Sequence, residues 1–447
     1  MPFQKFVALV SLSMFAMPVR AEPPPATLTL RQAEEIAITQ RPLLRSGELA
    51  TVSARQNTFY AESARFPQLS ANITAVDAYR EETTQNGKDV TLDTRIAAGG
   101  LNNPTILRRE AGGLSLSQLI ADFGRTSSLV ESAKLSEAAQ LHQLHATRSQ
   151  VLLEVIDAFY SVLGAQAVLV VASKTIDERK LLLDKIALLA KNKMKSELDV
   201  TFARINFEEA RLLMLKAENS LEAAFSRLST SLGYRDNRHF ILQGESNLSE
   251  PPKELEVMLE QALRARPELL GLRSEQEAAM KSADAASALR YPTISAFAAG
   301  GTTVRGDDRL SRYYGAIGVN LNMTFLDGGK ISSLQQQAQL RAMAMKENLT
   351  EAENSVVKNV RTAWLNARSS YESIDITSQL KNAASEAFKL AEARYNLGLT
   401  SIVELNQAQL SAVGAEIANG RARYEYQIAR AVLDYQVGSL ELVSIAH

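Results

Sequence analysis

Two histidines, His142 and His145, lie three residues apart in a helical pattern. At this spacing two imidazoles share one face of a helix and can bind one metal ion. A third histidine or a carboxylate is not evident beside them, so we interpret the pair as solvated side chains of a helix surface. The sequence predicts no metal site.

Residues 122–125 read DFGR, the letters of a protein-kinase motif, but the glycine-rich loop, the catalytic-loop signature and the lysine strand of kinases are missing. The chain contains no cysteine, which excludes disulfides, thiolate metal sites and a lipid attached to cysteine. Phosphate-binding loops, nucleophile elbows and zinc helices are also missing. We therefore expect no enzyme activity and no cofactor.

The composition favours long helices. Lys and Arg number 49 against 50 Asp and Glu, so no basic surplus suggests nucleic acid as a partner. Aromatic residues make up only 6% of the 447 residues and there is one tryptophan, which is low for a thick globular core. Long, narrow helical interfaces fit this composition better.

The first 21 residues predict a signal peptide. Lys5 precedes an apolar run, and Val19-Arg20-Ala21 fits the small-residue rule for cleavage. The alternative is a disordered apolar tail. No later segment has the 18 or so continuous apolar residues of a membrane-spanning helix. We expect an exported protein whose mature chain begins at Glu22.

The chain reads as a tandem duplication. Arg41-Pro42 matches Arg266-Pro267 at an offset of 225, and Asp122-Phe-Gly124 matches Asp327-Gly-Gly329 at an offset of 205. The second offset persists over some eighty residues, which indicates a repeat. We predict a first repeat at residues 22–245, a second at residues 246–438 and a tail at residues 439–447.

Each repeat contains two segments of period two, which predict strands. The first strands start at Pro67 and Pro292, and glycines Gly124 and Gly329 mark the corners where strands give way to helices. In the last segment the apolar residues alternate with polar ones from Ile317 to Phe325. Four strands that are apolar on one side cannot close a barrel alone and would leave bare edges. Three subunits would supply twelve strands for a membrane barrel, and a small soluble sandwich is the alternative.

A heptad seam follows each corner and predicts a helix of about 65 residues, or roughly 100 Å. The seam positions are Leu152, Val155, Phe159, Val162, Gln166 and Leu169 in the first repeat, of which Gln166 is polar, and Val357, Val360, Trp364, Ala367, Tyr371 and Ile374 in the second. At Gly398 the chain reverses, and a shorter helix returns. We therefore predict a mostly α-helical protein with a long antiparallel hairpin in each repeat.

The duplicated plan, the opening LTLRQAEEIA at residues 28–37 and the tip RYNLGLTSIVELNQAQ at residues 394–409 together resemble the TolC family. This family consists of trimeric outer-membrane exit ducts of Gram-negative efflux pumps and type I secretion systems. The resemblance implies a twelve-stranded barrel in outer-membrane lipid and an α-barrel tunnel in the periplasm. It also implies that the tip docks onto a periplasmic adaptor and an inner-membrane pump that is driven by protons or ATP. The docking residues are Gly398, Leu399, Thr400 and Ser401.

The resemblance further implies a gate at the hairpin tips. Asp199 and Tyr395 match residues that the family can link, and Glu404 matches an acidic residue of the constriction. The second acidic position is Gln407 here, and Thr400 stands where some members have a gate arginine. Three copies of Glu404 around one axis would repel and attract cations. The alternative is that Glu404 only favours the start of its helix.

Two classes of function remain at this stage. The favoured one is a passive, gated exit duct for multidrug export or type I secretion, located in the outer membrane. The alternative is a periplasmic coiled-coil adaptor or scaffold. Two hairpins and only four long strands argue against an adaptor, which has one hairpin and many short strands. The cargo cannot be predicted from the sequence.

Overall fold

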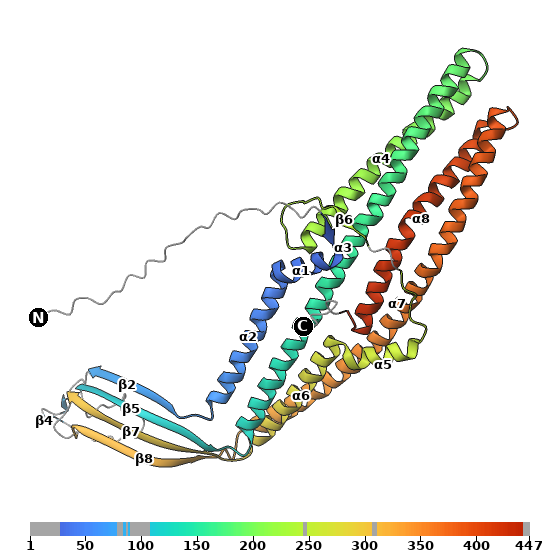
Figure 1. Ribbon diagram of the computed structural model, residues 1–447. Helices are drawn as coiled ribbons and strands as arrows, with labels where there is room; N and C mark the ends of the chain where they lie inside the picture. The colour runs from blue at the N-terminus through green and yellow to red at the C-terminus, as the bar shows by residue number, and fades with distance from the viewer. Residues whose placement is uncertain are drawn as a thin grey trace, which may run out of the picture.

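The computed structural model describes residues 27–77, 84–85, 88–89, 108–244, 248–305 and 311–440. These residues form a long helical body with a β-sheet at one end (Figure 1). The predicted signal peptide, the predicted repeat boundary at residues 245–246 and residues 441–447 of the predicted tail lie outside the described residues.

The two halves of the described chain contain helices of matching length in the same order. The short helices are α1 (Leu30–Gln40) and α5 (Leu255–Ala265), with 11 residues each, and α2 (Pro42–Ser63) and α6 (Pro267–Ala288), with 22 each. The long helices are α3 (Arg125–Lys191) and α7 (Lys330–Asn396), with 67 residues each. The returning helices are α4 (Glu197–Ser231) and α8 (Ile402–Val437), with 35 and 36. The predicted long hairpins are confirmed.

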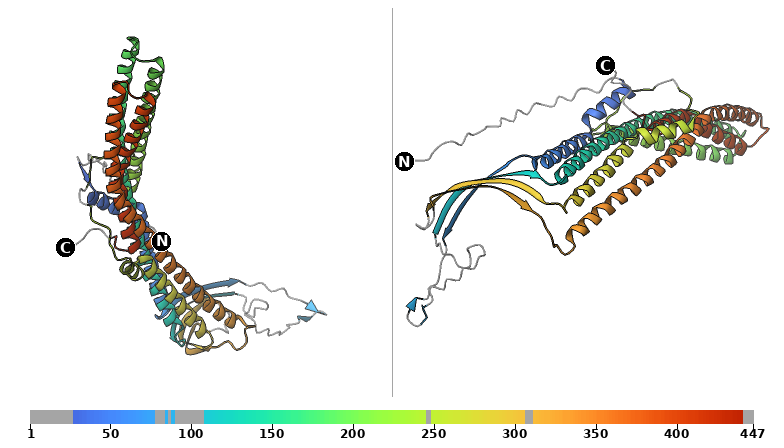
Figure 2. Two further views of the ribbon diagram at one scale, coloured as in Figure 1. Left: turned by 90° about the vertical axis from the view of Figure 1, so that its right-hand side faces the viewer. Right: turned by 90° about the horizontal axis from the view of Figure 1, so that it is seen from below.

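The helices pack as a row rather than as a bundle. Toward the hairpin tips, α3 contacts α4 on one side and α8 on the other, and α8 also contacts α7. Toward the sheet, α3 lies between α2 and α6, and α6 contacts α7 (Figures 1 and 2). The order across the row is therefore α4–α3–α8–α7 at one end and α2–α3–α6–α7 at the other. Within the described chain, α7 and the α2/α4 pair are the edges of the row.

The predicted seam is buried in part, and four of its positions on α7 are half-buried: Val357, Trp364, Tyr371 and Ile374. Leu152, Val155, Phe159 and Val162 of α3 are buried, and Val360 and Ala367 of α7 are buried too. One 18-residue window of α3 is on average apolar enough to cross a membrane by length and composition. More than half of that window is buried against other helices. A helix with neighbours on several sides must be apolar over most of its circumference.

The repeated Arg-Pro pair joins the short helices to the returning ones. Each proline occupies the first turn of its helix, where a missing N–H costs nothing. Arg41 donates from Nη1 to the carbonyl oxygen of Thr230 at 3.1 Å, and Arg266 donates from Nη1 to Gln436 Oε1 at 2.9 Å. Each arginine thus binds the carboxyl end of the returning helix, where cations are favoured.

Four long strands form one antiparallel sheet in the order β2–β5–β7–β8. Their bounds are Gln68–Asp77, Arg108–Ala121, Thr293–Arg305 and Tyr313–Asn322. Because β8 ends at Asn322, the predicted extension of this strand to Phe325 was wrong. Short pairs that the sequence did not predict also occur, β1 (Leu28–Thr29) with β6 (Leu242–Gln243) and β3 (Thr84–Gln85) with β4 (Lys88–Asp89).

One face of the long sheet is apolar and open. The register places Leu69 opposite Leu116, Leu116 opposite Ala298, and Ala298 opposite Ile317, so these four side chains share a face. Ile317 is 89% exposed. On the other face the Ser70 and Ser115 hydroxyls bond at 2.7 Å. The alternation predicted from the sequence is confirmed.

The corners between strands and helices form where the sequence predicts them. Pro67 and Pro292 directly precede β2 and β7, and Gly124 and Gly329 are the left-handed N-caps of α3 and α7, with φ of 95° and 90°. The aspartate of each corner satisfies the first turn of the helix. Asp327 Oδ2 accepts from the Ile331 N–H at 2.6 Å, and backbone donors of this kind lower the pKa of Asp327. The DFGR segment is thus a helix cap.

Candidate functional site

The site implied by the sequence lies at the two hairpin tips, at the far end of the row from the sheet (Figure 1). Both tips have the same backbone path. Lys193 in the first and Gly398 in the second adopt a left-handed conformation, with φ of 60° and 75°. The Leu399 N–H then donates to the Arg394 carbonyl at 2.9 Å, and an equivalent bond closes the first tip. This is the usual glycine C-cap of a helix, which the first tip makes with a lysine instead.

Each tip turn exposes apolar side chains to solvent. Leu397 and Leu399 are 74% and 67% exposed in the second tip, and Met194 is 70% exposed in the first. A Cβ built on Gly398 would meet no atom within 4 Å. Exposed apolar side chains at a protruding turn form a surface that a partner protein can cover.

Serines cap both returning helices, but the acidic residue that follows behaves differently in each. Asp199 closes a capping box with Ser196: its Oδ2 accepts from the Ser196 N–H at 3.0 Å and from Ser196 Oγ at 2.8 Å. In the second tip, Ser401 Oγ accepts from the Glu404 N–H at 3.4 Å, and the carboxylate of Glu404 is directed elsewhere. Asp199 therefore stabilises the start of its helix by capping, and the carboxylate of Glu404 does not close such a capping box.

Glu404 forms an ion pair across its own turn. Its Oε1 lies 3.2 Å from Arg394 Nη1, and its Oε2 accepts from the Thr400 hydroxyl. Both charged side chains are about half exposed. Thr400, which stands where some family members have an arginine, thus orients this carboxylate. The acidic residue implied for the constriction is partly neutralised within its own chain.

Tyr395 is buried among apolar residues at the point where the two hairpins meet. Only 3% of it is exposed, and its hydroxyl has no hydrogen-bond partner in the described chain. Burial, and to a lesser degree the nearby Asp199 carboxylate, raise the pKa of Tyr395 to about 12. Asp199 therefore lies near Tyr395, but its carboxylate bonds to Ser196 instead.

The sequence did not reveal several contacts that join the first hairpin to the second. Lys195 Nζ lies 3.7 Å above the centroid of the Tyr395 ring, a cation–π contact. Lys185 Nζ donates to Asn396 Oδ1 at 3.0 Å, and the Asn206 amide donates to Asn406 Oδ1. The one available signal was Asn206, a polar residue on an otherwise alanine-rich buried stripe of α4.

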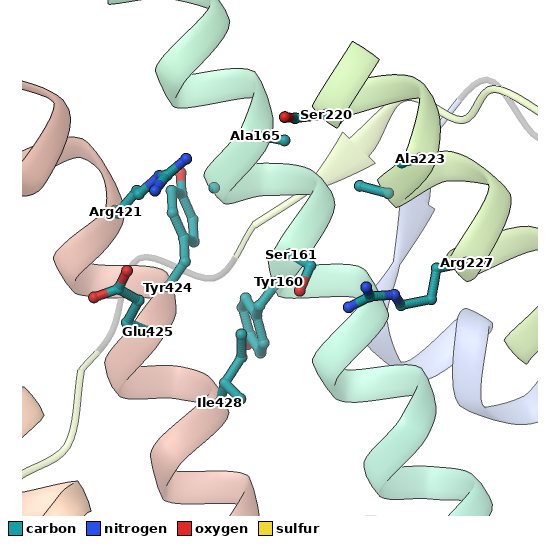
Figure 3. A pocket seen from close by; sticks show the side chains of 12 residues that line it. Tyr160, Ser161, Ala165, Ser220, Ala223, Arg227, Arg421, Tyr424, Glu425 and Ile428 are labelled. Atoms are coloured by element: carbon teal, nitrogen blue, oxygen red, sulfur yellow. The ribbon is translucent and has the colours of Figure 1, made fainter. Parts of the chain in front are cut away.

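Away from the tips, a groove of about 370 Å³ lies over α3 between α4 and α8 (Figure 3). Arg227 of α4 and Arg421 of α8 line its two walls, and Glu425 lies beside Tyr424 on the α8 wall. The two histidines of α3 are elsewhere. Burial and the neighbouring His145 lower the pKa of His142, which favours a neutral imidazole.

Comparison with known proteins identifies the family. The family model of outer membrane efflux proteins matches residues 35–234 and 258–439. Outer membrane protein TolC of Salmonella enteritidis is 24% identical over 430 residues, which cover 92% of this chain and 83% of that protein. TolC of Vibrio cholerae is 26% identical over 394 residues, covering 84% of this chain and 88% of that one.

The fold has relatives among solved structures. The CmeC outer membrane channel of Campylobacter jejuni superposes with a TM-score of 0.78 at 16% identity, covering 92% of this chain and 85% of that one. Both halves of the chain, with their two hairpins, fall inside the regions matched by the family model. The chain therefore belongs to the outer membrane efflux protein family.

Proposed function

We propose that this protein is the outer-membrane exit duct of a tripartite efflux pump in a Gram-negative bacterium. In this proposal it is a passive homotrimer that is not an enzyme, is exported by residues 1–21 and extends into the periplasm. A periplasmic adaptor docks on the tips and an inner-membrane pump, driven by protons or ATP, supplies the energy. Family membership supports this class of function, and TolC, OprJ and CmeC are outer-membrane proteins of related sequence or fold.

The observation that carries the proposal is that the edge helices of the row and the edge strands of the sheet both lack a neighbour within the described chain. The edge helices α4 and α7 expose large apolar residues on the side away from their own neighbours. They are Leu198, Ile205, Leu212 and Leu215 on α4, and Leu365, Ile376 and Leu390 on α7. A stripe that no helix of its own chain covers is typical of a subunit interface.

The sheet has the same need for a partner. Its outer strands, β2 and β8, each have one unpaired edge in the described chain, and its open face is apolar. A closed ring removes unpaired edges, and an apolar outer face with a polar inner face suits a barrel in lipid. Three copies bring twelve strands, enough for a water-filled lumen. We propose that the same ring joins α4 of one subunit to α7 of the next and so closes an α-helical tunnel.

The matching helices support a duplication as the origin of the chain, with repeats at residues 22–245 and 246–438. Equal lengths of 11, 22 and 67 residues recur in the same order. In the duct, we assign the gate to Asp199, Tyr395 and Glu404. Docking is assigned to the turn of Gly398, Leu399, Thr400 and Ser401.

The absence of cysteine allows a direct test of the ring. Leu215 lies 22 residues beyond Lys193 and Ile376 lies 22 residues before Gly398, so both are at one height above the tips. A Leu215→Cys/Ile376→Cys variant should form disulfides between subunits, and the ladder on a denaturing gel should end at the trimer. The control pair Ala210→Cys/Ile376→Cys should not cross-link, since Ala210 faces α3 and is buried. A ladder that ends at the dimer or continues past the trimer would contradict the proposal.

The scaffold alternative makes a different prediction. A periplasmic adaptor or scaffold would be recovered in the soluble periplasmic fraction without detergent. A type I secretion duct would share every feature described here, so the genes encoding neighbouring pump components would distinguish it from a multidrug exporter.

A further inference from the structure

A second cavity, of about 250 Å³, lies between the two hairpins some distance below the tips. α8 contributes one side, and α3 and α7 contribute the others. Its lining residues are Glu178, Leu181, Leu182, Lys185, Phe388, Glu392, Leu405 and Gln409. Because these residues come from both hairpins, an occupant would contact both at once.

Gln409 gives this cavity an unmet hydrogen-bonding need. Its side chain is only 3% exposed, and its Oε1 has no hydrogen-bond partner in the described chain. A buried acceptor without a donor is unfavourable. A ligand that carries an N–H group would therefore be favoured over one that only accepts hydrogen bonds.

The charges around the cavity favour a cation. Glu178 and Glu392 are acidic, and Lys185 is the one basic residue of the lining. Lys185 already donates to Asn396 Oδ1 at 3.0 Å, and Glu178 has only a distant contact, 3.9 Å, with Lys174. The net charge of the lining is thus negative. The groove of Figure 3 is different, because two arginines and one glutamate line it.

The remaining lining is apolar and sets the size of the ligand. Leu181, Leu182 and Phe388 offer contacts to hydrocarbon or an aromatic ring. An apolar cavity of about 150 Å³ accommodates benzene, so about 250 Å³ has room for one ring and a short chain. The chemistry that fits every wall is an apolar body that ends in a protonated amine.

We propose that this inter-hairpin cavity binds small arylalkyl amines in their protonated form. The ammonium group donates to Gln409 Oε1 and lies near Glu178 and Glu392, while the ring packs against Phe388. Since the ligand contacts α3, α7 and α8, its binding stabilises the packed arrangement of the two hairpins and slows their separation. This action goes beyond the proposed duct function, because the ligand bound in the inter-hairpin cavity is not the cargo that passes through the duct.

Binding is tested with 4-phenylbutylamine and the full-length protein in detergent, by isothermal titration calorimetry. The uncharged alcohol 4-phenylbutanol serves as the matched ligand, because it partitions into detergent but lacks the ammonium group. We expect the amine to bind about tenfold more tightly than the alcohol. Gln409→Leu and Glu392→Gln should each weaken the amine about tenfold, the size expected for one lost polar contact. Arg421→Ala, in the groove of Figure 3, should leave it unchanged.

Glu392 is exposed, so its variant tests the proposal even if Gln409→Leu alters the packing of the helices. Equal binding of amine and alcohol, or equal binding by wild type and both variants, would overturn the proposal. So would the absence of binding by the wild type. None of these outcomes bears on the ring of subunits, which the cysteine pairs test separately.

Discussion

Lys193 and Gly398 occupy the same place in the two hairpin tips, yet the residues around them make different hydrogen bonds. In the first tip a lysine adopts the left-handed conformation, and Ser196 and Asp199 satisfy each other in a capping box. In the second tip a glycine adopts that conformation without strain. There the acidic side chain bonds across the turn to Arg394 instead of capping the helix.

The difference is that the first tip uses its acidic residue to cap a helix, whereas the second tip leaves side chains exposed for other contacts. The first tip uses its polar groups locally, so its acidic residue has its hydrogen bonds inside its own turn. The second tip keeps a half-exposed carboxylate, a buried tyrosine hydroxyl without a partner, and two exposed leucines. Side chains that remain exposed in one chain are candidates for contacts with another. We therefore expect Asp199 to act on the gate through the stability of its own helix start, and Glu404 to act on it through its half-exposed charge.

The largest effect on stability should come from the glycine of the second tip. Gly398→Val places a β-branched residue at a φ of 75°, which we expect to destabilise the tip by about 2 kcal/mol. Hydrogen exchange at the Leu399 amide, which donates to Arg394, reports this opening. Lys193→Gly is the matched variant and should slow exchange at the equivalent amide of Met194. Unchanged exchange in both variants would show that the backbone conformation is not what distinguishes the tips.

The capping box of the first tip should give the next largest effect. Asp199→Ala removes two hydrogen bonds to Ser196 and should cost about 1 kcal/mol of helix stability. Asp199→Asn keeps an acceptor oxygen and should cost less. The measurement is proteolysis at the first tip under native conditions. If Asp199→Asn opened the tip as much as Asp199→Ala, the charge of Asp199 and not its hydrogen bonds would be important.

The exposed ion pair of the second tip should contribute less. Glu404→Gln removes the attraction to Arg394, and exposed pairs contribute about 0.2–1 kcal/mol. The loss should disappear at about 1 M salt, where such attractions are screened. Hydrogen exchange at the second tip in low and high salt tests this. A loss that persists in high salt would assign the effect to the hydrogen bond from Thr400.

The smallest effect at neutral pH should come from Tyr395→Phe, because the hydroxyl makes no bond in the described chain. At alkaline pH the two proteins should diverge. The pKa of Tyr395 is raised from about 10 to about 12, so the folded state binds the phenol proton more tightly than the unfolded state. The corresponding stability is present below pH 10 and is lost as the pH rises to about 12.

The Tyr395→Phe variant has no phenol proton to lose at this position, so its stability should not fall for this reason between pH 10 and about 12. An absorbance titration of tyrosinate should lose its most alkaline component in this variant. If the titration is unchanged, another tyrosine has the raised pKa; burial also raises the pKa of Tyr426 and Tyr435.

The sequence predicted most of the fold because the relevant signals are local and repeated. Residues such as Leu152 and Phe159 recur with the period of a helix, and Leu69 and Ile73 recur with the period of a strand. Gly124 and Gly329 adopt the left-handed conformation expected at a corner. The packing of α6 and α8 against α3 could not be predicted, because both helices are distant from it in sequence.

The site was predicted less completely. Arg394 and Glu404 are ten residues apart on opposite sides of a turn, and no periodicity pairs them. Lys195 reaches Tyr395 from a hairpin 200 residues earlier. The sheet offers a similar case, because Tyr314 lies over Gly301 and Gly113, where an added Cβ would come within 2.4 Å of its hydroxyl. Such contacts depend on tertiary packing, and side-chain patterns along the chain do not encode them directly.

The most direct test of the duct is the conductance of the purified oligomer in a planar lipid bilayer, with and without Glu404→Ala. We predict discrete, cation-selective channels of low conductance in the wild type. The variant should conduct more and be less selective. Asp199→Asn keeps the acceptor oxygen that caps the helix start and should therefore resemble the wild type. A monomeric protein that needs no detergent and forms no channels would contradict the account and leave a periplasmic scaffold.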